Sequence, residues 1–112
     1  MKKKNVLFVC TGNINRSKTA EELFKEWERL KVKSAGIYWA AKTPLSRELI
    51  DWADIIFVME ELHNNYIANW FPDALGKVVI LGIEDVYITN DPRLITILKK
   101  NVIPYLKRLL KK

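Results

Sequence analysis

The sequence predicts an α/β fold in which helices cover both faces of a four-stranded parallel sheet. The first observation is that short apolar runs and amphipathic helical patterns alternate along the whole chain, which is typical of a parallel sheet with right-handed crossovers. The second is that the strand candidates are continuous apolar runs, as expected when both faces of a sheet are buried. Both observations favour a sheet enclosed between two layers of helices.

The four strand candidates are short apolar runs that lie between the helical patterns. They are residues 5–10, 32–35, 54–59 and 77–81. Helices are expected over residues 16–30, 46–52 and 60–71, and from residue 92 to the end. In the first helix the apolar residues recur at helical spacing; they are Ala20, Leu23, Phe24, Trp27 and Leu30.

Capping and turn residues define several boundaries. Ser46 can cap the second helix, and Pro72 and Gly76 are expected to bracket a loop. Asp91 can cap the last helix, since Pro92 is favoured in a first turn. Pro104 is expected to kink that helix.

Length and composition predict one domain, residues 1–112, and exclude several classes of protein. About half of the residues are apolar, which is enough for a core. The apolar runs are far shorter than the ~20 residues of a membrane helix, and the one after the basic start is too short for a signal peptide. We therefore expect a cytoplasmic protein that contacts no membrane. The net charge of +6 suits anionic ligands, but the excess near both ends favours a role in solubility over nucleic-acid binding.

One loop carries the candidate chemistry. Cys10 ends the first predicted strand, and Arg16 begins the first predicted helix five residues later. In parallel sheets, ligands bind beyond the carboxyl ends of the strands. The backbone N–H groups of a curled loop, together with a helix N-terminus, form an anion site. Gly12 and Asn13 tolerate the left-handed conformations that such a loop needs.

The side chains of this loop suit a phosphate and a nucleophile. Arg16 has a permanently charged fork that matches two phosphate oxygens. The positive field favours the thiolate form of Cys10, which is the nucleophilic form. The Ser17 hydroxyl can donate to that sulfur. A lone cysteine is more often a buried hydrophobe, so the prediction rests on the strand, the helix and Ser17 together.

Residues 9–17, followed by Thr19-Ala20-Glu21, resemble the phosphate-binding loop of the low-molecular-weight protein tyrosine phosphatases, V-C-x-G-N-x-C-R-S-P-x-A-E. Residues 34–36, 53–60 and 77–82 are similar to the family's second, third and fourth strands. The resemblance implies the family's three-layer fold, the phosphotyrosine protein phosphatase I-like fold.

The resemblance also implies roles for single residues. It makes Cys10 the nucleophile and Arg16 the phosphate ligand, with Asn13 shaping the loop and Ser17 stabilising the thiolate. The other expected substrate-binding residues are Thr11, Gly12, Ile14, Asn15 and Tyr87. Asn15 stands where many relatives have a second cysteine, Lys18 stands where they have proline, and the segment between residues 36 and 46 is shorter than theirs.

A general acid is expected after the fourth strand, where the family has an aspartate in an Asp-Pro-Tyr loop. Asp85 keeps the spacing to Tyr87, whereas Asp91 keeps the Asp-Pro dipeptide. Asp91 also stands where a helix cap is needed. Asp85 is therefore preferred, and Asp91 remains the alternative.

Tyr38, Trp39 and His63 have less specific signals than the cysteine-containing loop. Tyr38 and Trp39 follow the second strand and could flank a phenyl phosphate or form a plain rim contact. His63 has no metal-ligand partner at a suitable spacing, so it is expected to be a solvated helix position. Neither a metal ion nor a cofactor is expected.

The residues favour covalent catalysis on a phosphate, and the resemblance implies hydrolysis of phosphotyrosine or another aryl phosphomonoester through a phosphocysteine. The partners would be a phosphorylated protein or a small aryl phosphate, with inorganic phosphate as product. An arsenate reductase would need an external thiol, because Cys10 is the only cysteine. A phosphocysteine carrier would not need Arg16 together with Ser17, or a late aspartate. A non-catalytic phosphate-binding module is the other form of this alternative. Both are kept as alternatives.

Overall fold

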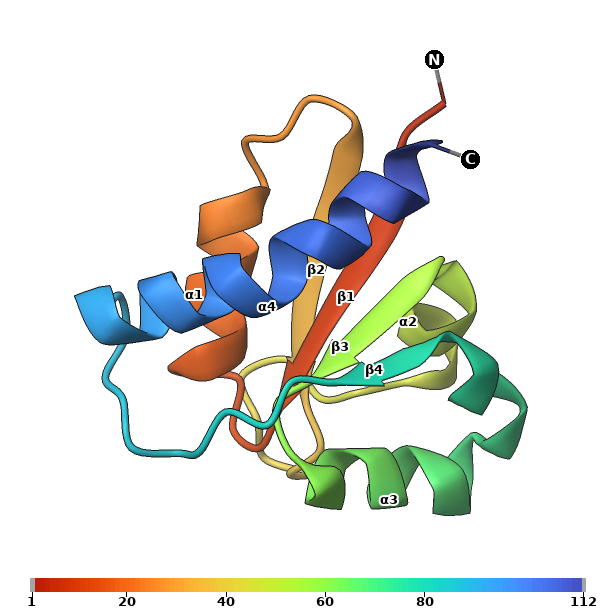
Figure 1. Ribbon diagram of the computed structural model, residues 1–112. Coiled ribbons are helices and arrows are strands. Elements are labelled where there is room, and N and C mark those ends of the chain that lie inside the picture. Colours follow the sequence, from red (N-terminus) through yellow and green to blue (C-terminus); the bar gives the residue numbers. More distant parts are fainter. Residues whose placement is uncertain (1, 112) are drawn as a thin grey trace.

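The computed structural model describes residues 2–111, and it contains a four-stranded sheet between two layers of helices (Figure 1). The strands are β1 (Lys4–Cys10), β2 (Leu30–Gly36), β3 (Ile55–Val58) and β4 (Val78–Ile80). The helices are α1 (Arg16–Phe24), α2 (Arg47–Trp52), α3 (Glu61–Trp70), the 3₁₀ helix η1 (Pro72–Lys77) and α4 (Pro92–Lys111). The predicted α/β class is confirmed.

The sheet has the order β2-β1-β3-β4, and all of its strand pairs are parallel. The chain moves from β1 to one side for β2 and then to the other side for β3. The connections therefore diverge between β1 and β3, and a crevice forms beyond the carboxyl ends of these two strands. Cys10 ends β1 at this point.

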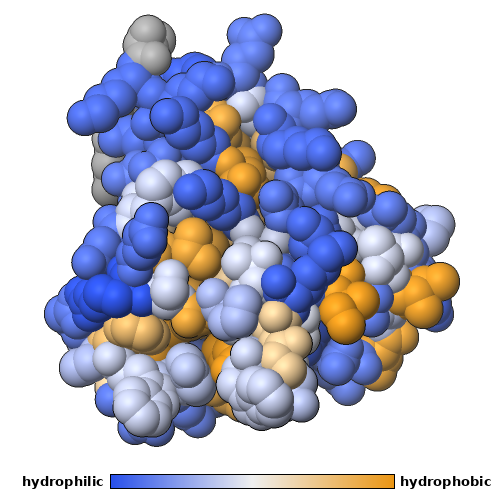
Figure 2. Space-filling model, turned by 180° about the vertical axis from the view of Figure 1, so that it is seen from behind, coloured by the Kyte–Doolittle hydropathy of each residue, from blue (hydrophilic) through white to orange (hydrophobic). Residues whose placement is uncertain are grey.

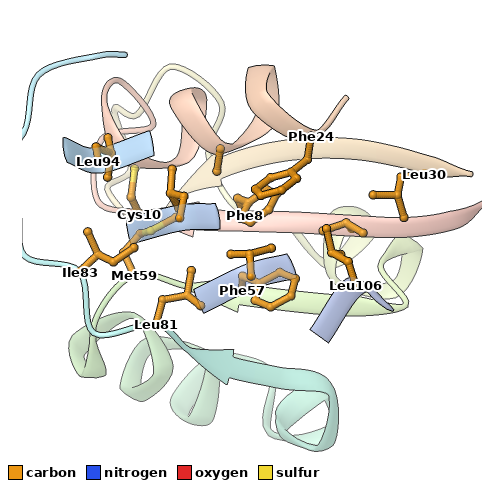
Figure 3. Packing of buried hydrophobic residues seen from close by; sticks show 14 residues of the cluster. Phe8, Cys10, Phe24, Leu30, Phe57, Met59, Leu81, Ile83, Leu94 and Leu106 are labelled. Atoms are coloured by element: carbon orange, nitrogen blue, oxygen red, sulfur yellow. The ribbon is translucent and has the colours of Figure 1, made fainter. Parts of the chain in front are cut away.

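Alternate residues of β1 enter two separate cores, because successive side chains of a strand point to opposite faces. Val6, Phe8 and Cys10 pack with buried residues of α1 and α4, whereas Leu7 and Val9 pack with those of α2 and α3. Figure 3 shows Cys10 at the same end of the first core as Met59, Ile83 and Leu94. The nucleophile candidate is thus anchored in the α1–α4 side of the protein.

Two predicted elements differ from the structure. The first helix ends at Phe24 rather than residue 30, because Leu30 pairs with Lys4 and begins β2. The loop expected at Pro72 and Gly76 is the 3₁₀ helix η1. Proline suits its first turn, and Ala74 packs into the second core. In both places tertiary pairing or packing decides the local conformation.

The caps expected for α2 and α4 are present. Ser46 accepts a hydrogen bond from the Leu49 N–H, and Asp91 Oδ1 accepts one from the Arg93 N–H at 2.9 Å. Helix α4 continues through Pro104 to Lys111. Within residues 2–111, no helix combines the length and the apolarity needed to cross a bilayer. The face opposite to that of Figure 1 is largely hydrophilic, with apolar side chains visible in separate places (Figure 2).

Candidate active site

The loop of residues 10–16, called the cysteine loop below, curls around the Cys10 sulfur. Asn13 has the left-handed conformation that the sequence led us to expect, with φ of 56°. Gly12 does not have a positive φ, so the expectation is met by Asn13 alone. The Asn13 N–H donates to Cys10 Sγ at 3.2 Å. The loop thus directs a backbone donor at the sulfur.

A chain of side-chain hydrogen bonds supplies the second donor to this sulfur. Ser34 Oγ donates to the Glu21 carboxylate, so it must accept from Asn13 Nδ2, which lies 2.9 Å away. Asn13 Nδ2 also donates to Ser17 Oγ at 2.8 Å. The Ser17 proton is therefore free to point at Cys10 Sγ, 2.9 Å from its oxygen. Two donors on one sulfur favour a negative charge there.

Gly36 allows the cysteine loop to pack against the end of β2. A Cβ at this position would overlap the Thr11 carbonyl oxygen and would lie 3.0 Å from the Asn13 nitrogen. The residues after Gly36 hold the loop further, since the Tyr38 N–H donates to the Thr11 carbonyl at 3.0 Å. In the sequence, Gly36 only marks the end of the second predicted strand. Its close approach to a distant loop is visible only in the fold.

Arg16 is 2% exposed and is held from one side. Its Nη1 lies 2.5 Å from Glu60 Oε1 and donates to the Ile83 carbonyl at 2.8 Å. Both hydrogen bonds use Nη1, so the Nε and Nη2 edge, which has only the Asp85 carboxylate 3.7 Å from Nε among residues 2–111, is open to two oxygens of a phosphate. Glu60 was not predicted as a site residue, although it directly follows β3 at the carboxyl end of the sheet. Ligands bind beyond the carboxyl ends of parallel strands, and this rule indicates Glu60 as well as Cys10.

One pocket contains most of the predicted site residues. Its lining consists of Cys10, Thr11, Gly12, Ile14, Asn15, Arg16 and Asp85. Asn13 and Ser17 lie behind this lining, fully buried. Tyr87 lies outside it, and its ring packs against the α1–α4 core beneath Arg93. Contact of Tyr87 with a substrate therefore stays a prediction.

The two acid candidates have different surroundings. Asp85 Oδ1 is 3.7 Å from Arg16 Nε, and its side chain is 63% exposed. Asp91 instead caps α4 and pairs with Arg93, and hydrogen bonds from Arg93 lower the pKa of its carboxyl. The fold brings Asp85, and not Asp91, to the pocket with Cys10 and Arg16.

His63 was expected to be solvated, and that expectation is wrong. Its side chain is fully buried, and its Nε2 lies 3.0 Å from Thr11 Oγ1 in the pocket lining. Burial, aided by the positive charge of Arg16, lowers the pKa of His63 to about 4, so the ring is neutral at physiological pH. Its position in the first turn of α3 gave no sign of this contact in the sequence.

The arrangement can bind a tetrahedral anion and attack it. A sulfur with two donors, a guanidinium edge and a carboxyl group share one pocket. These are the parts needed for nucleophilic displacement at phosphorus with proton transfer to the leaving group.

Comparisons with known proteins give the same indication. Residues 5–44 match the family model described as low molecular weight phosphotyrosine protein phosphatase. The chain is 35% identical over 106 residues to the low molecular weight protein-tyrosine-phosphatase Ptp of Acinetobacter johnsonii, covering 73% of this chain and 75% of that protein. It is 31% identical over 104 residues to the protein-arginine-phosphatase of Bacillus subtilis, covering 69% of each.

Solved structures agree over nearly the full length. The tyrosine phosphatase Wzb from Escherichia coli K30, in complex with phosphate, superposes with a TM-score of 0.79 at 25% identity and covers 96% of this chain and 99% of its own. A mutant of the YwlE arginine phosphatase with a phosphorylated active-site serine has a TM-score of 0.76 at 27% identity, with 96% and 97% covered. By sequence and by fold, the chain belongs to the low molecular weight phosphotyrosine protein phosphatases, a family of cysteine-dependent phosphatases.

Proposed function

We propose that this protein hydrolyses phosphotyrosine or other aryl phosphomonoesters through a phosphocysteine on Cys10. The observation that carries the proposal is the pair of hydrogen bonds to Cys10 Sγ, from the Asn13 N–H and the Ser17 hydroxyl, in a pocket shared with Arg16 and Asp85. A sulfur that accepts two hydrogen bonds beside a guanidinium is the arrangement needed for covalent catalysis on a phosphate.

In the first step the Cys10 thiolate attacks phosphorus, and the bond from phosphorus to the leaving oxygen breaks. Asp85 in its protonated form gives its proton to that oxygen. Arg16 binds two of the remaining phosphate oxygens through its Nε and Nη2 edge, where negative charge shifts in the transition state. The products of this step are a phenol and phosphocysteine.

In the second step water attacks the phosphocysteine. Asp85, now a carboxylate, accepts the proton from the water, and the bond from sulfur to phosphorus breaks. Inorganic phosphate leaves and the thiolate returns. One carboxyl group thus acts as acid and then as base. A covalent step agrees with the relative YwlE, an arginine phosphatase whose mutant carries a phosphorylated active-site serine.

The experiment is turnover of para-nitrophenyl phosphate with rapid-quench mass spectrometry. Wild-type protein should release phosphate and show a transient mass increase of one phosphoryl group on Cys10. Cys10→Ser should abolish turnover and still bind inorganic phosphate or vanadate. Turnover by Cys10→Ser at the wild-type rate would refute the proposal.

Substrate class needs a separate comparison, because relatives named for tyrosine and for arginine phosphatase activity match at 35% and 31% identity. A phosphotyrosine peptide and a phosphoarginine peptide of the same sequence should be compared by kcat/KM. We expect the phosphotyrosine peptide to be preferred. Preference for phosphoarginine would retain the phosphocysteine chemistry and overturn the aryl substrate.

A further inference from the structure

His63 joins the start of α3 to the cysteine loop from inside the protein. Its ring is fully buried, with Nδ1 2.9 Å from the Glu60 backbone nitrogen and Nε2 3.0 Å from Thr11 Oγ1. The proposed reaction uses neither nitrogen. The histidine is therefore a buried polar group whose second contact is the hydroxyl of Thr11, a residue of the pocket lining.

The contact with Glu60 determines which ring nitrogen carries the proton. A backbone N–H can only donate, so Nδ1 must accept and cannot carry a hydrogen. In a neutral ring the proton then lies on Nε2, which donates to Thr11 Oγ1. Burial and the nearby Arg16 both favour this neutral ring, while Glu60 and Asp85 oppose them.

The bond from His63 leaves Thr11 with a free proton. Its oxygen is already an acceptor, and among residues 2–111 no other partner is found for this hydroxyl. Thr11 lines the pocket together with Cys10 and Arg16. A phosphate bound in this pocket would bring an oxygen that can accept a hydrogen bond from the Thr11 hydroxyl.

We propose that His63 is a positioning residue that turns the Thr11 hydroxyl into a hydrogen-bond donor to the bound phosphate. This inference rests on the proposed function, because it assumes a phosphate in that pocket. Glu60 links the two phosphate donors, the Arg16 guanidinium and the Thr11 hydroxyl. Its carboxylate holds Arg16, and its backbone N–H sets the tautomer of His63, which in turn orients Thr11. The start of α3 thus supports both Arg16 and Thr11.

Two substitutions separate this role from a purely structural one. His63→Asn places an amide oxygen near Nδ1, so it can still accept the Glu60 N–H, but it is too short to reach Thr11. His63→Gln places an amide nitrogen near Nε2, so it can still donate to Thr11 while losing the Glu60 contact. A structural role predicts that both variants behave according to their stability alone. The positioning role predicts that phosphate affinity follows the Thr11 contact.

The test measures inorganic phosphate binding by calorimetry in the Cys10→Ser background, so that it does not depend on turnover. Thr11→Val should weaken binding about tenfold, the usual effect of one hydrogen bond to a charged group, and Thr11→Ser should retain it. His63→Asn should cause a similar loss, and His63→Gln a smaller one. In the Thr11→Val background, His63→Asn should cause no further loss.

Three outcomes would overturn the inference. They are full phosphate affinity in Thr11→Val, full affinity in His63→Asn, and a further tenfold loss from His63→Asn when Thr11 is already valine. If the expected pattern is found but wild-type protein cleaves no phosphoester, the inference stands for phosphate binding and the proposed catalysis fails. The two proposals are therefore refuted by different results.

Discussion

The cysteine loop and the segment of residues 81–91, called the aspartate segment below, contribute to the same pocket but are built differently. The loop lies between a strand and a helix, and Cys10, Asn13 and Arg16 are at most 3% exposed. The aspartate segment has no helix or strand, and its exposed residues include Val86 and Ile88, which are 65% and 74% exposed. The proposed nucleophile is thus held inside the core, and the proposed acid stands at the surface.

Hydrogen bonds hold the aspartate segment mainly at its two ends. At its start the Ile83 N–H donates to the Met59 carbonyl at 2.7 Å, and the Ile83 carbonyl accepts from Arg16. Near its end Thr89 Oγ1 lies 3.1 Å from the Ile14 carbonyl, and the Asn90 N–H donates to Thr19 Oγ1 at 2.9 Å. A segment with few buried contacts opens at a lower free energy than a core element. The proposed attack by Cys10 requires fixed geometry, which the buried cysteine loop provides. The proposed proton transfer by Asp85 requires access to varied leaving groups, which the exposed aspartate segment provides.

Among the changes that distinguish the two regions, removal of the proposed acid should have the largest effect. Asp85→Asn should slow hydrolysis of a poor leaving group by about 10²–10⁴, the usual contribution of acid catalysis. The loss should shrink for an activated phenol, which leaves without a proton. The measurement is kcat for a series of aryl phosphates of differing phenol pKa, with Asp91→Asn as the matched control. Leaving-group dependence in Asp91→Asn instead of Asp85→Asn would reverse the assignment.

A change in the cysteine loop should instead be independent of the leaving group. Arg16→Lys should lower kcat by about 10²–10³, the usual cost of one transition-state donor, because an ammonium cannot form the planar fork. Arg93→Lys, on the surface pair with Asp91, is the matched control. Near wild-type kcat in Arg16→Lys would contradict the role of the guanidinium.

His63, which contacts the cysteine loop from inside the protein, should affect how the free energy of unfolding depends on pH. The pKa of His63 is lowered to about 4 in the folded protein, whereas an unfolded histidine titrates near 6.5. Between these values the unfolded state binds more protons, so the contribution of His63 is present above pH 6.5 and is lost as the pH falls towards 4. The loss is about 3 kcal/mol at most.

Urea unfolding of wild-type protein and His63→Asn at several pH values measures this contribution, because the other titrating groups are common to both proteins. The difference in unfolding free energy should shrink as the pH falls from 7 to 4. A difference that stays constant over this range would show that His63 does not titrate as a buried neutral ring.

The smallest effect is expected where the two regions are joined. Thr89 Oγ1 contacts both the Ile14 carbonyl and Asn15 Oδ1, at 3.1 Å and 2.8 Å. Thr89→Val should lower kcat about fivefold for poor leaving groups, the effect of one neutral hydrogen bond, because the acid becomes less well positioned. Phosphate binding in the Cys10→Ser background should not change.

Thr96→Val is the matched control for this change, because the Thr96 hydroxyl bonds only within α4, to the Pro92 carbonyl. It should leave the kinetics unaltered. If Thr89→Val weakens phosphate binding as much as it lowers kcat, the contact shapes the cysteine loop and not the position of Asp85.

The strand, loop and helix around Cys10 could be predicted because their signals are local. An apolar run, a glycine, an asparagine that tolerates positive φ and a helical pattern stand next to one another in the chain. The end of α1 and the 3₁₀ helix could not be predicted in the same way. Pairing of Leu30 with β1 and packing of Ala74 in the core decide these two places.

By itself the sequence determined the α/β class and placed Cys10, Arg16 and Ser17 on one loop, because these features depend on neighbouring residues. Only the tertiary structure decided which distant groups serve that loop. Glu60 reaches Arg16 across 44 positions, and His63 reaches Thr11 across 52. The same holds for Asp85, which the fold brings to the pocket in preference to Asp91. These contacts depend on the order of parallel strands, whose carboxyl ends bring residues far apart in sequence to one edge of the sheet.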